Sequence, residues 1–283
     1  MDGSRFVVWR RRRDGAACEG VLSVDYPNLA VAARLSITWL KARGRACNRP
    51  LEFALGSRGL ESSVINRQSE ERTSEEQRMK LLCFSDLHRD RGAAERLVEM
   101  SSEADVVIGA GDFAVRRQGL GDTLDVLAQI SKPAVLVPGN GESVEELTEA
   151  AAQWKSAHVL HGTGCQCLGI PFWGVGGGIP VTPFGDWSYD FDEQQGEQLL
   201  EGCDAGGVLV VHSPPIDTVD HDSSGKIRGS RSVRSTVENR RPRLVVCGHI
   251  HSDWEKQCQL GETLILNAGP KGVMLDIDFE PKS

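Results

Sequence analysis

Short apolar runs alternate with helical stripes along the chain from Met79 onward. Residues 81–84 form an apolar run, and apolar positions then recur at helical spacing over residues 94–101. Two similar units follow, with apolar runs at residues 106–108 and 134–138. Runs of this length fit strands, and stripes of this period fit amphipathic helices. Three consecutive strand–loop–helix units predict an α/β fold with a parallel core.

The second half of the chain is less regular. Residues 208–211 and 244–247 are continuous apolar runs, as expected for strands covered on both faces, and a helix is predicted over residues 192–200. Ser143 with Glu146 three positions later is a capping box, which predicts the start of a further helix. Shorter strands are predicted at residues 159–160, 167–168 and 172–175, around Trp254, and at residues 263–266 and 273–277.

The first 78 residues lack a sustained helical or strand period and end in a polar stretch. We therefore predict that residues 1–78 are an N-terminal extension, disordered or outside the core, in front of a domain at residues 79–283. Sequence upstream of a true start at Met79, an organellar targeting segment and a small partner-binding segment are the alternatives. Four acidic residues among the first 25 count against targeting.

Charge and cysteine content narrow the range of partners. Residues 1–78 carry 14 Lys and Arg against 10 Asp and Glu, whereas residues 79–283 carry 18 against 30. A domain with a net charge of about −12 repels a phosphate backbone and disfavours nucleic acid as a partner.

The longest apolar run among the first 50 residues has twelve residues and contains Arg34, so it is too short and too charged to span a membrane. Scattered cysteines in apolar runs, such as Cys83 and Cys247, predict a reducing, cytoplasmic location.

Polar, metal-competent side chains directly follow the predicted strands. In open α/β sheets, ligands bind beyond the carboxyl ends of the strands. Seven such residues occur there: Asp86, His88, Asp112, Asn140, His212, His249 and His251. Seven nitrogen and oxygen donors exceed one tetrahedral site but suit two metals that share a carboxylate. We predict two divalent metal ions, with Mn, Fe, Zn, Co and Ni all compatible with the donors.

Five ordered motifs carry a resemblance over residues 79–283. The segments SDLH, AGDF, PGNG, VVHSPP and CGHIH resemble the signature of the calcineurin-like metallophosphoesterase superfamily. The resemblance implies a four-layer α/β/β/α sandwich, in which helices flank two central mixed β-sheets. It places Asp86, His88 and His251 on one metal. It places Asn140, His212 and His249 on the other, with Asp112 as the bridge.

One position departs from this family pattern. Many members carry a histidine after the GN pair, and that histidine assists the leaving group, whereas this chain has Gly141. A positioned acid contributes about 10² to 10⁴ in rate, so its loss is most costly for a poor leaving group. Similar departures accompany phosphodiesterases in the family. His221, in the loop between two ligand motifs, is a candidate for phosphate contact or proton transfer.

The sequence thus predicts a metal-dependent phosphoesterase, with a phosphodiesterase favoured. A metal-bridging hydroxide would attack phosphorus, with Asp112, Asn140 and His221 as catalytic residues. The alternatives are a phosphomonoesterase that uses another acid residue, a non-catalytic scaffold with the same fold, and a nuclease, which the acidic charge disfavours. The predicted partner is a small phosphate-ester substrate, with no membrane. The sequence does not indicate the oligomeric state.

Overall fold

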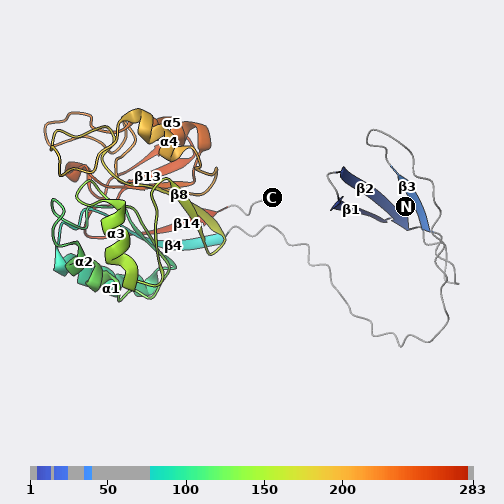
Figure 1. The fold of residues 1–283 in the computed structure, drawn as a ribbon, viewed down its shortest axis with the longest axis horizontal. Helices are drawn as coiled ribbons and strands as arrows, with labels where there is room; N and C mark the ends of the chain where they lie inside the picture. The colour runs from blue at the N-terminus through green and yellow to red at the C-terminus, as the bar shows by residue number, and fades with distance from the viewer. Residues whose placement is uncertain (1–4, 14–15, 25–34, 40–76, 280–283) are drawn as a thin grey trace. The chain divides into compact units, whose positions relative to one another are not determined.

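The computed structural model describes residues 5–13, 16–24, 35–39 and 77–279 (Figure 1). The chain divides into two compact units, residues 1–68 and residues 69–283, and each is described by itself. In the first unit, β1 (Arg5–Arg13), β2 (Ala16–Val24) and β3 (Leu35–Trp39) form an antiparallel sheet in that order. The sequence pattern predicted no strands here, and backbone pairing rather than apolar alternation defines them. Residues 40–76 lie outside the described residues, so the extension at residues 1–78 stays a prediction.

The second unit contains two sheets, each of mixed direction. The five-stranded sheet has the order β14–β4–β5–β6–β7, and β14 is its one antiparallel strand. Its strands are β4 (Gln77–Phe84), β5 (Val106–Gly109), β6 (Ala134–Leu136), β7 (Ala157–Val159) and β14 (Val273–Phe279). The six-stranded sheet has the order β12–β13–β11–β10–β9–β8, with antiparallel strands at its two edges. Its strands are β8 (Thr163–Cys167), β9 (Ile170–Val175), β10 (Val208–Val211), β11 (Leu244–Cys247), β12 (Gln257–Leu260) and β13 (Thr263–Asn267).

In the described part of the second unit, five α-helices cover the outer faces of the two sheets. Figure 1 shows α4 and α5 above the strands and α1 and α2 below them. The helices are α1 (Arg91–Met100), α2 (Leu120–Leu127), α3 (Val144–Ala150), α4 (Glu193–Leu200) and α5 (Arg231–Arg240). Single 3₁₀ turns lie at Ser101–Glu103, Ala151–Gln153 and His251–Asp253. This arrangement confirms the four-layer α/β/β/α sandwich.

Alternating strand residues build the layers. Leu81 and Cys83 of β4 belong to one apolar cluster with Val208 and Val210 of β10, so the two sheets pack face to face. Leu82 of β4 faces the other way, into a second cluster with side chains of α1, α2 and α3. The opposite faces of β10 and β11 pack against α4 and α5 in a third cluster. The continuous apolar runs at residues 208–211 and 244–247 are therefore covered on both sides, as predicted.

Within the second unit, most local predictions match the structure, and the strand predicted around Trp254 is wrong. Ser143 and Glu146 form both hydrogen bonds of the capping box at the start of α3. The strand predicted around Trp254 does not form, because the chain there makes a 3₁₀ turn and β12 begins only at Gln257. The Trp254 indole Nε1 donates a hydrogen bond to the Asp86 carboxylate at 3.1 Å, which holds this residue in the loop region.

Within the described part of the chain, no helix has the length and apolar character needed to cross a membrane.

Candidate metal centre

The seven predicted ligands lie in loops that follow strands of both sheets. Asp86 and His88 follow β4, Asp112 follows β5, and Asn140 follows β6. On the other sheet, His212 follows β10, while His249 and His251 follow β11. Because these strands are parallel within each sheet and the sheets pack together, residues as far apart as Asp86 and His251 meet at one edge.

One set of side chains forms what we call the first ligand group: Asp86, His88 and His251. The Nε2 atoms of His88 and His251 lie 3.0 Å apart. The Asp86 Oδ1 atom lies 3.7 Å from Nε2 of His251 and 4.0 Å from Nε2 of His88. These three side chains offer donor atoms within 4.8 Å of one another, a spacing that suits a common metal ion.

A second ligand group consists of Asn140, His212 and His249. The Asn140 Oδ1 atom lies 3.2 Å from Nε2 of His212 and 3.1 Å from Nδ1 of His249, and these two nitrogens are 3.2 Å apart. Two bonds of about 2.1 Å from one metal at tetrahedral or octahedral angles place their donor atoms about 3.0–3.4 Å apart. The triangle of donors therefore has the dimensions of a metal site.

Asp112 lies between the two groups. Its Oδ2 atom is 3.7 Å from Nε2 of His88, and its Oδ1 atom is 3.6 Å from Nε2 of His212. The backbone N–H of Gly141 donates a hydrogen bond to Oδ1 at 2.7 Å and fixes the carboxylate. A carboxylate in this position could be shared by metal ions held at the two groups.

Backbone carbonyls orient two of the four histidine rings. Nδ1 of His212 lies 2.8 Å from the Ala110 carbonyl oxygen, and Nδ1 of His88 lies 3.3 Å from that of Ala114. A ring that donates its Nδ1–H to a carbonyl presents the lone pair of Nε2, which is the arrangement found around metal-binding histidines. Imidazole and carboxylate donors with this support fit divalent transition metals.

The protonation of the rings also bears on metal binding. Burial, together with the nearby His212, lowers the pKa of His249 to about 3, so this ring is neutral at pH 7. Burial lowers the pKa of His212 by itself, but the carboxylates of Asp112 and Asp86 outweigh it and raise that pKa. Since a histidine ligand must be neutral, a metal held by His212 would have to displace a proton from this ring at low pH.

Four of the seven residues have left-handed backbone conformations. The φ angles are 54° at Asp86, 45° at His88, 57° at Asp112 and 68° at His249. This region is uncommon for residues with a side chain, and it persists where surrounding contacts enforce it. Here Asp86 N–H bonds the Gly111 carbonyl at 2.8 Å, which ties the loops after β4 and β5 together.

Two residues outside the five motifs support the predicted ligands. The Trp254 indole N–H donates a hydrogen bond to the Asp86 carboxylate, as described above. Glu142 is fully buried and accepts hydrogen bonds from the N–H groups of Ala114 at 3.0 Å and Gly139 at 2.8 Å. It thereby joins the loops that carry Asp112 and Asn140. Burial, and then the charge of Asp112, raise the pKa of Glu142 to about 7. Its position directly after the PGNG motif was the available signal.

The structure does not bring His221 together with the seven ligands. Its side chain is 49% exposed, and its Nδ1 lies 3.8 Å from carboxylate oxygens of Asp220 and Asp253. It is absent from the lining of the large cleft described next. A catalytic role for His221 stays a prediction, and no contact in the described region favours it.

A cleft of about 1170 Å³ opens at the ligand groups. Five of the seven ligands line it: His88, Asp112, Asn140, His249 and His251. Residues 180–184, between β9 and α4, also line the cleft, and so do Arg228 and Arg231. Arg231 is the first residue of α5, whose Val233 and Val237 are buried. The cleft therefore combines the donors with side chains from distant segments.

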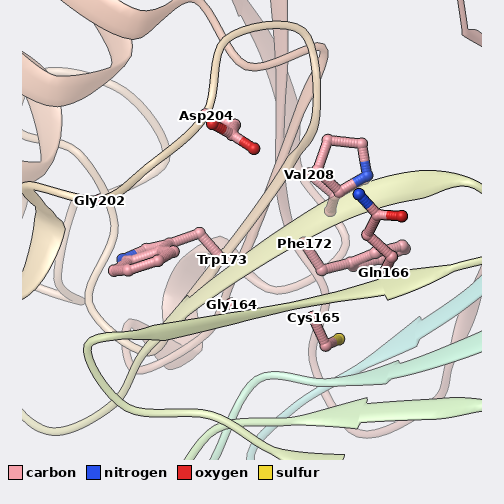
Figure 2. Close-up of a pocket in the computed structure, with 9 residues that line it drawn as sticks. Gly164, Cys165, Gln166, Phe172, Trp173, Gly202, Asp204 and Val208 are labelled. Atoms are coloured by element: carbon pink, nitrogen blue, oxygen red, sulfur yellow. The ribbon is translucent and has the colours of Figure 1, made fainter. Parts of the chain in front are cut away.

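A smaller cavity of about 240 Å³ lies elsewhere, between β8, β9 and the segment after α4. Figure 2 shows Cys165, Trp173 and Asp204 among the residues around it. None of the predicted ligands lines it, so it is separate from the candidate metal centre.

Comparison with known proteins shows the family of the chain and a shared fold. The model of the calcineurin-like phosphoesterase superfamily domain matches residues 79–276. Among solved structures, TT1561 of Thermus thermophilus is similar in fold, with a TM-score of 0.57 and 17% identity over 71% of this chain and 99% of that chain. A dimetal phosphatase from Danio rerio is 13% identical, with a TM-score of 0.49, over 72% of this chain and 99% of that chain. No curated protein matches the chain. Since the family model spans well over half of the sequence, the chain belongs to the calcineurin-like phosphoesterase superfamily.

Proposed function

We propose that the chain is a metal-dependent phosphodiesterase with two divalent metal ions. The observation that carries this proposal is the position of Asp112, whose two oxygens face the first and second ligand groups. Two cations there would lower the pKa of water and neutralise charge on a bound phosphate ester. In the reaction, water adds to phosphorus, and the leaving oxygen departs with the electron pair of the broken P–O bond and takes up a proton.

The chain's own residues hold and orient the reacting groups in this proposal. His88, His249 and His251 line the cleft and would place their metals at its surface. Asp112, held by the Gly141 amide, sets the separation of the two ligand groups. The acidic balance of residues 79–283 supports a small phosphate ester rather than nucleic acid as substrate. Six free cysteines among the described residues support the proposed cytoplasmic location.

Preference for a diester rests on which imidazoles line the cleft. In the described lining of the cleft, every imidazole belongs to one of the two ligand groups. Gly141 supplies no side chain at the position where many relatives carry histidine. A diester with a stable leaving anion needs little protonation of that group, whereas an alkyl monoester needs much more.

The test compares turnover of bis(p-nitrophenyl) phosphate with that of p-nitrophenyl phosphate, with each candidate metal added in turn. We expect metal-dependent turnover and a clear preference for the diester. Faster hydrolysis of the monoester would overturn the diester assignment, and a lack of metal dependence would overturn the whole proposal.

Gly141→His tests the physical reason for that preference. Gly141 has no positive φ, and a Cβ there would lie 3.1 Å from Asp112 Oδ1 and 3.2 Å from the Ala114 carbonyl oxygen. The neighbours must therefore shift by a few tenths of an ångström. We expect the ratio of monoester to diester turnover to rise about tenfold or more. Gly141→Ala is the matched control, because it adds the Cβ without the ring. Equal ratios in the two variants, at equal metal content, would contradict the explanation.

A further inference from the structure

The cleft contains most of the exposed large apolar side chains of the described region. Five such side chains are exposed, and four of them line the cleft. These four form what we call the apolar wall: Val115, Val181, Phe184 and Ile227, with exposed fractions of 38%, 62%, 50% and 46%. The fifth, Leu168, is 53% exposed and lies outside the cleft lining. Single exposed apolar residues are ordinary, but their concentration on one cleft marks a binding surface.

Three segments far apart in the sequence supply the apolar wall. Val115 comes from the loop after β5, Val181 and Phe184 from the segment between β9 and α4, and Ile227 from the segment between β10 and α5. More apolar residues line the same cleft: Pro180, Pro183, Ile216 and Ile250. The volume of about 1170 Å³ far exceeds the space that a phosphate group occupies, so the cleft has room for a large substituent.

A cation also lines the cleft next to the apolar wall. The Cζ atom of Arg116 lies 5.4 Å from the ring centroid of Trp187, and within the described part of the chain no carboxylate pairs with its guanidinium. Arg228 is different, because its Nε already bonds Asp222 at 2.8 Å. Arg116 is therefore available to an anionic oxygen of a ligand.

We infer that the substrate is an amphiphilic phosphodiester, in which the phosphate binds at the ligand groups and an alkyl chain on one ester oxygen packs against the apolar wall. This inference rests on the proposed function. The donors and Arg116 match the charged end of such a molecule, and the apolar wall matches its chain.

The character of the apolar wall favours an alkyl chain over a flat ring. Val115, Val181 and Ile227 present methyl groups. The one aromatic member, Phe184, already stacks on Trp187, with ring centroids 5.7 Å apart and planes inclined by 14°. Methyl-lined surfaces accept a flexible chain without fixing the orientation of a ring plane.

A homologous series of substrates measures this interaction. The metal-loaded protein is assayed with p-nitrophenyl diesters of phosphate whose second group is methyl, butyl or octyl, all below the concentration at which they form micelles. The leaving group is the same throughout, so differences in kcat/KM report how well the alkyl chain binds. We expect kcat/KM to rise about twofold per methylene group, because the half-exposed apolar wall buries only part of each one. The butyl ester should then exceed the methyl ester by about tenfold.

Substitutions locate the binding surface. Val181→Asn and Phe184→Asn should flatten the dependence of kcat/KM on chain length. Leu168→Asn is the matched control, because it makes the same change at an exposed apolar residue outside the cleft, and it should leave the dependence unchanged. If kcat/KM still rises with alkyl-chain length in both wall variants, the alkyl chain does not bind at the apolar wall and the inference is overturned.

A binding measurement separates this inference from the proposed function. Calorimetric titration with methyl(octyl)phosphinate and with dimethylphosphinate, whose P–C bonds offer no ester to hydrolyse, should give the octyl compound at least tenfold higher affinity. Metal-dependent turnover with no effect of chain length would overturn the inference and leave the proposed function standing. Absent turnover with a strong octyl preference in calorimetry would overturn the proposed function and support the binding site. Equal affinities in calorimetry would overturn the inference in either case.

Discussion

The carboxylate of Asp112 faces both ligand groups at once, and its replacement should therefore affect both. In Asp112→Asn, one oxygen becomes an amide nitrogen that cannot bind a cation, and the negative charge is lost. We expect bound metal to fall well below two equivalents and turnover to fall at least about 100-fold, since loss of supporting residues alone costs about 10–100-fold at metal sites. Elemental analysis and a diester assay measure the two effects.

Asp122→Asn is the control for this change, because Asp122 is an exposed acid on α2. It should retain metal content and turnover. Two full equivalents of metal in purified Asp112→Asn would show that the bridge between the groups lies elsewhere.

At the scale of elements, Glu193 joins α4 to α5. Its carboxylate accepts hydrogen bonds from the N–H groups of Arg231 and Ser232, both at 2.8 Å, at the start of α5. Partial burial alone would raise the pKa of Glu193, but these hydrogen bonds outweigh it and lower the pKa below the ordinary value. A negative charge at a helix N-terminus is also favourable. The link therefore stabilises the packing of α4 on α5.

Glu193→Gln should make this stabilisation visible through its pH dependence. Because the folded-state pKa lies below the unfolded one, the stabilisation is present above the ordinary glutamate pKa and is lost as pH falls through the folded-state pKa. We expect the variant to lose about 1 kcal/mol of unfolding free energy at pH 7, a modest value because the group is partly exposed. In denaturant titrations, the difference in unfolding free energy between the unsubstituted protein and the variant should shrink below pH 4.5. Glu197→Gln, at an exposed position of the same helix, should show no such trend.

At the scale of the whole molecule, the second unit has its own core. All three apolar clusters draw on described residues between Met79 and Phe279. We expect a chain that lacks residues 1–68 to keep its metal-dependent turnover and its melting temperature. Failure of that chain to fold would contradict the prediction that the N-terminal segment lies outside the core.

The exact start of the second unit can be tested in the same way. Strand β4 begins at Gln77, and Arg78 forms an exposed ion pair with Asp276 at 3.3 Å. Removal of residues 1–78 therefore trims two positions of the pairing between β4 and β14. We expect an additional loss of about 1 kcal/mol or less relative to removal of residues 1–68, because exposed ion pairs contribute little. Denaturant titration of the two chains gives the difference.

The sequence determined the layered fold of the second unit and the chemistry at the strand ends. Continuous apolar runs such as residues 208–211 predict strands covered on both faces, and the Ser143 capping box predicts a helix start, because both signals are local. The predicted ligands were also readable, since Asp86 and His249 each stand two positions after such a run. Three strands in residues 5–39 and the turn at Trp254 were missed, because backbone pairing and a distant hydrogen bond decide them.

Only the tertiary structure decided which residues face one another. The 3.0 Å approach of His88 to His251 joins positions 163 residues apart, and it depends on how the two sheets pack. The same packing brings Val115, Val181 and Ile227 to one cleft and leaves His221 outside its lining. Apolar periodicity indicates which face of a helix or strand is buried. It contains no information on which distant loops lie next to one another. Strand order and sheet packing determine which loops are in contact, and therefore the shape of the cleft.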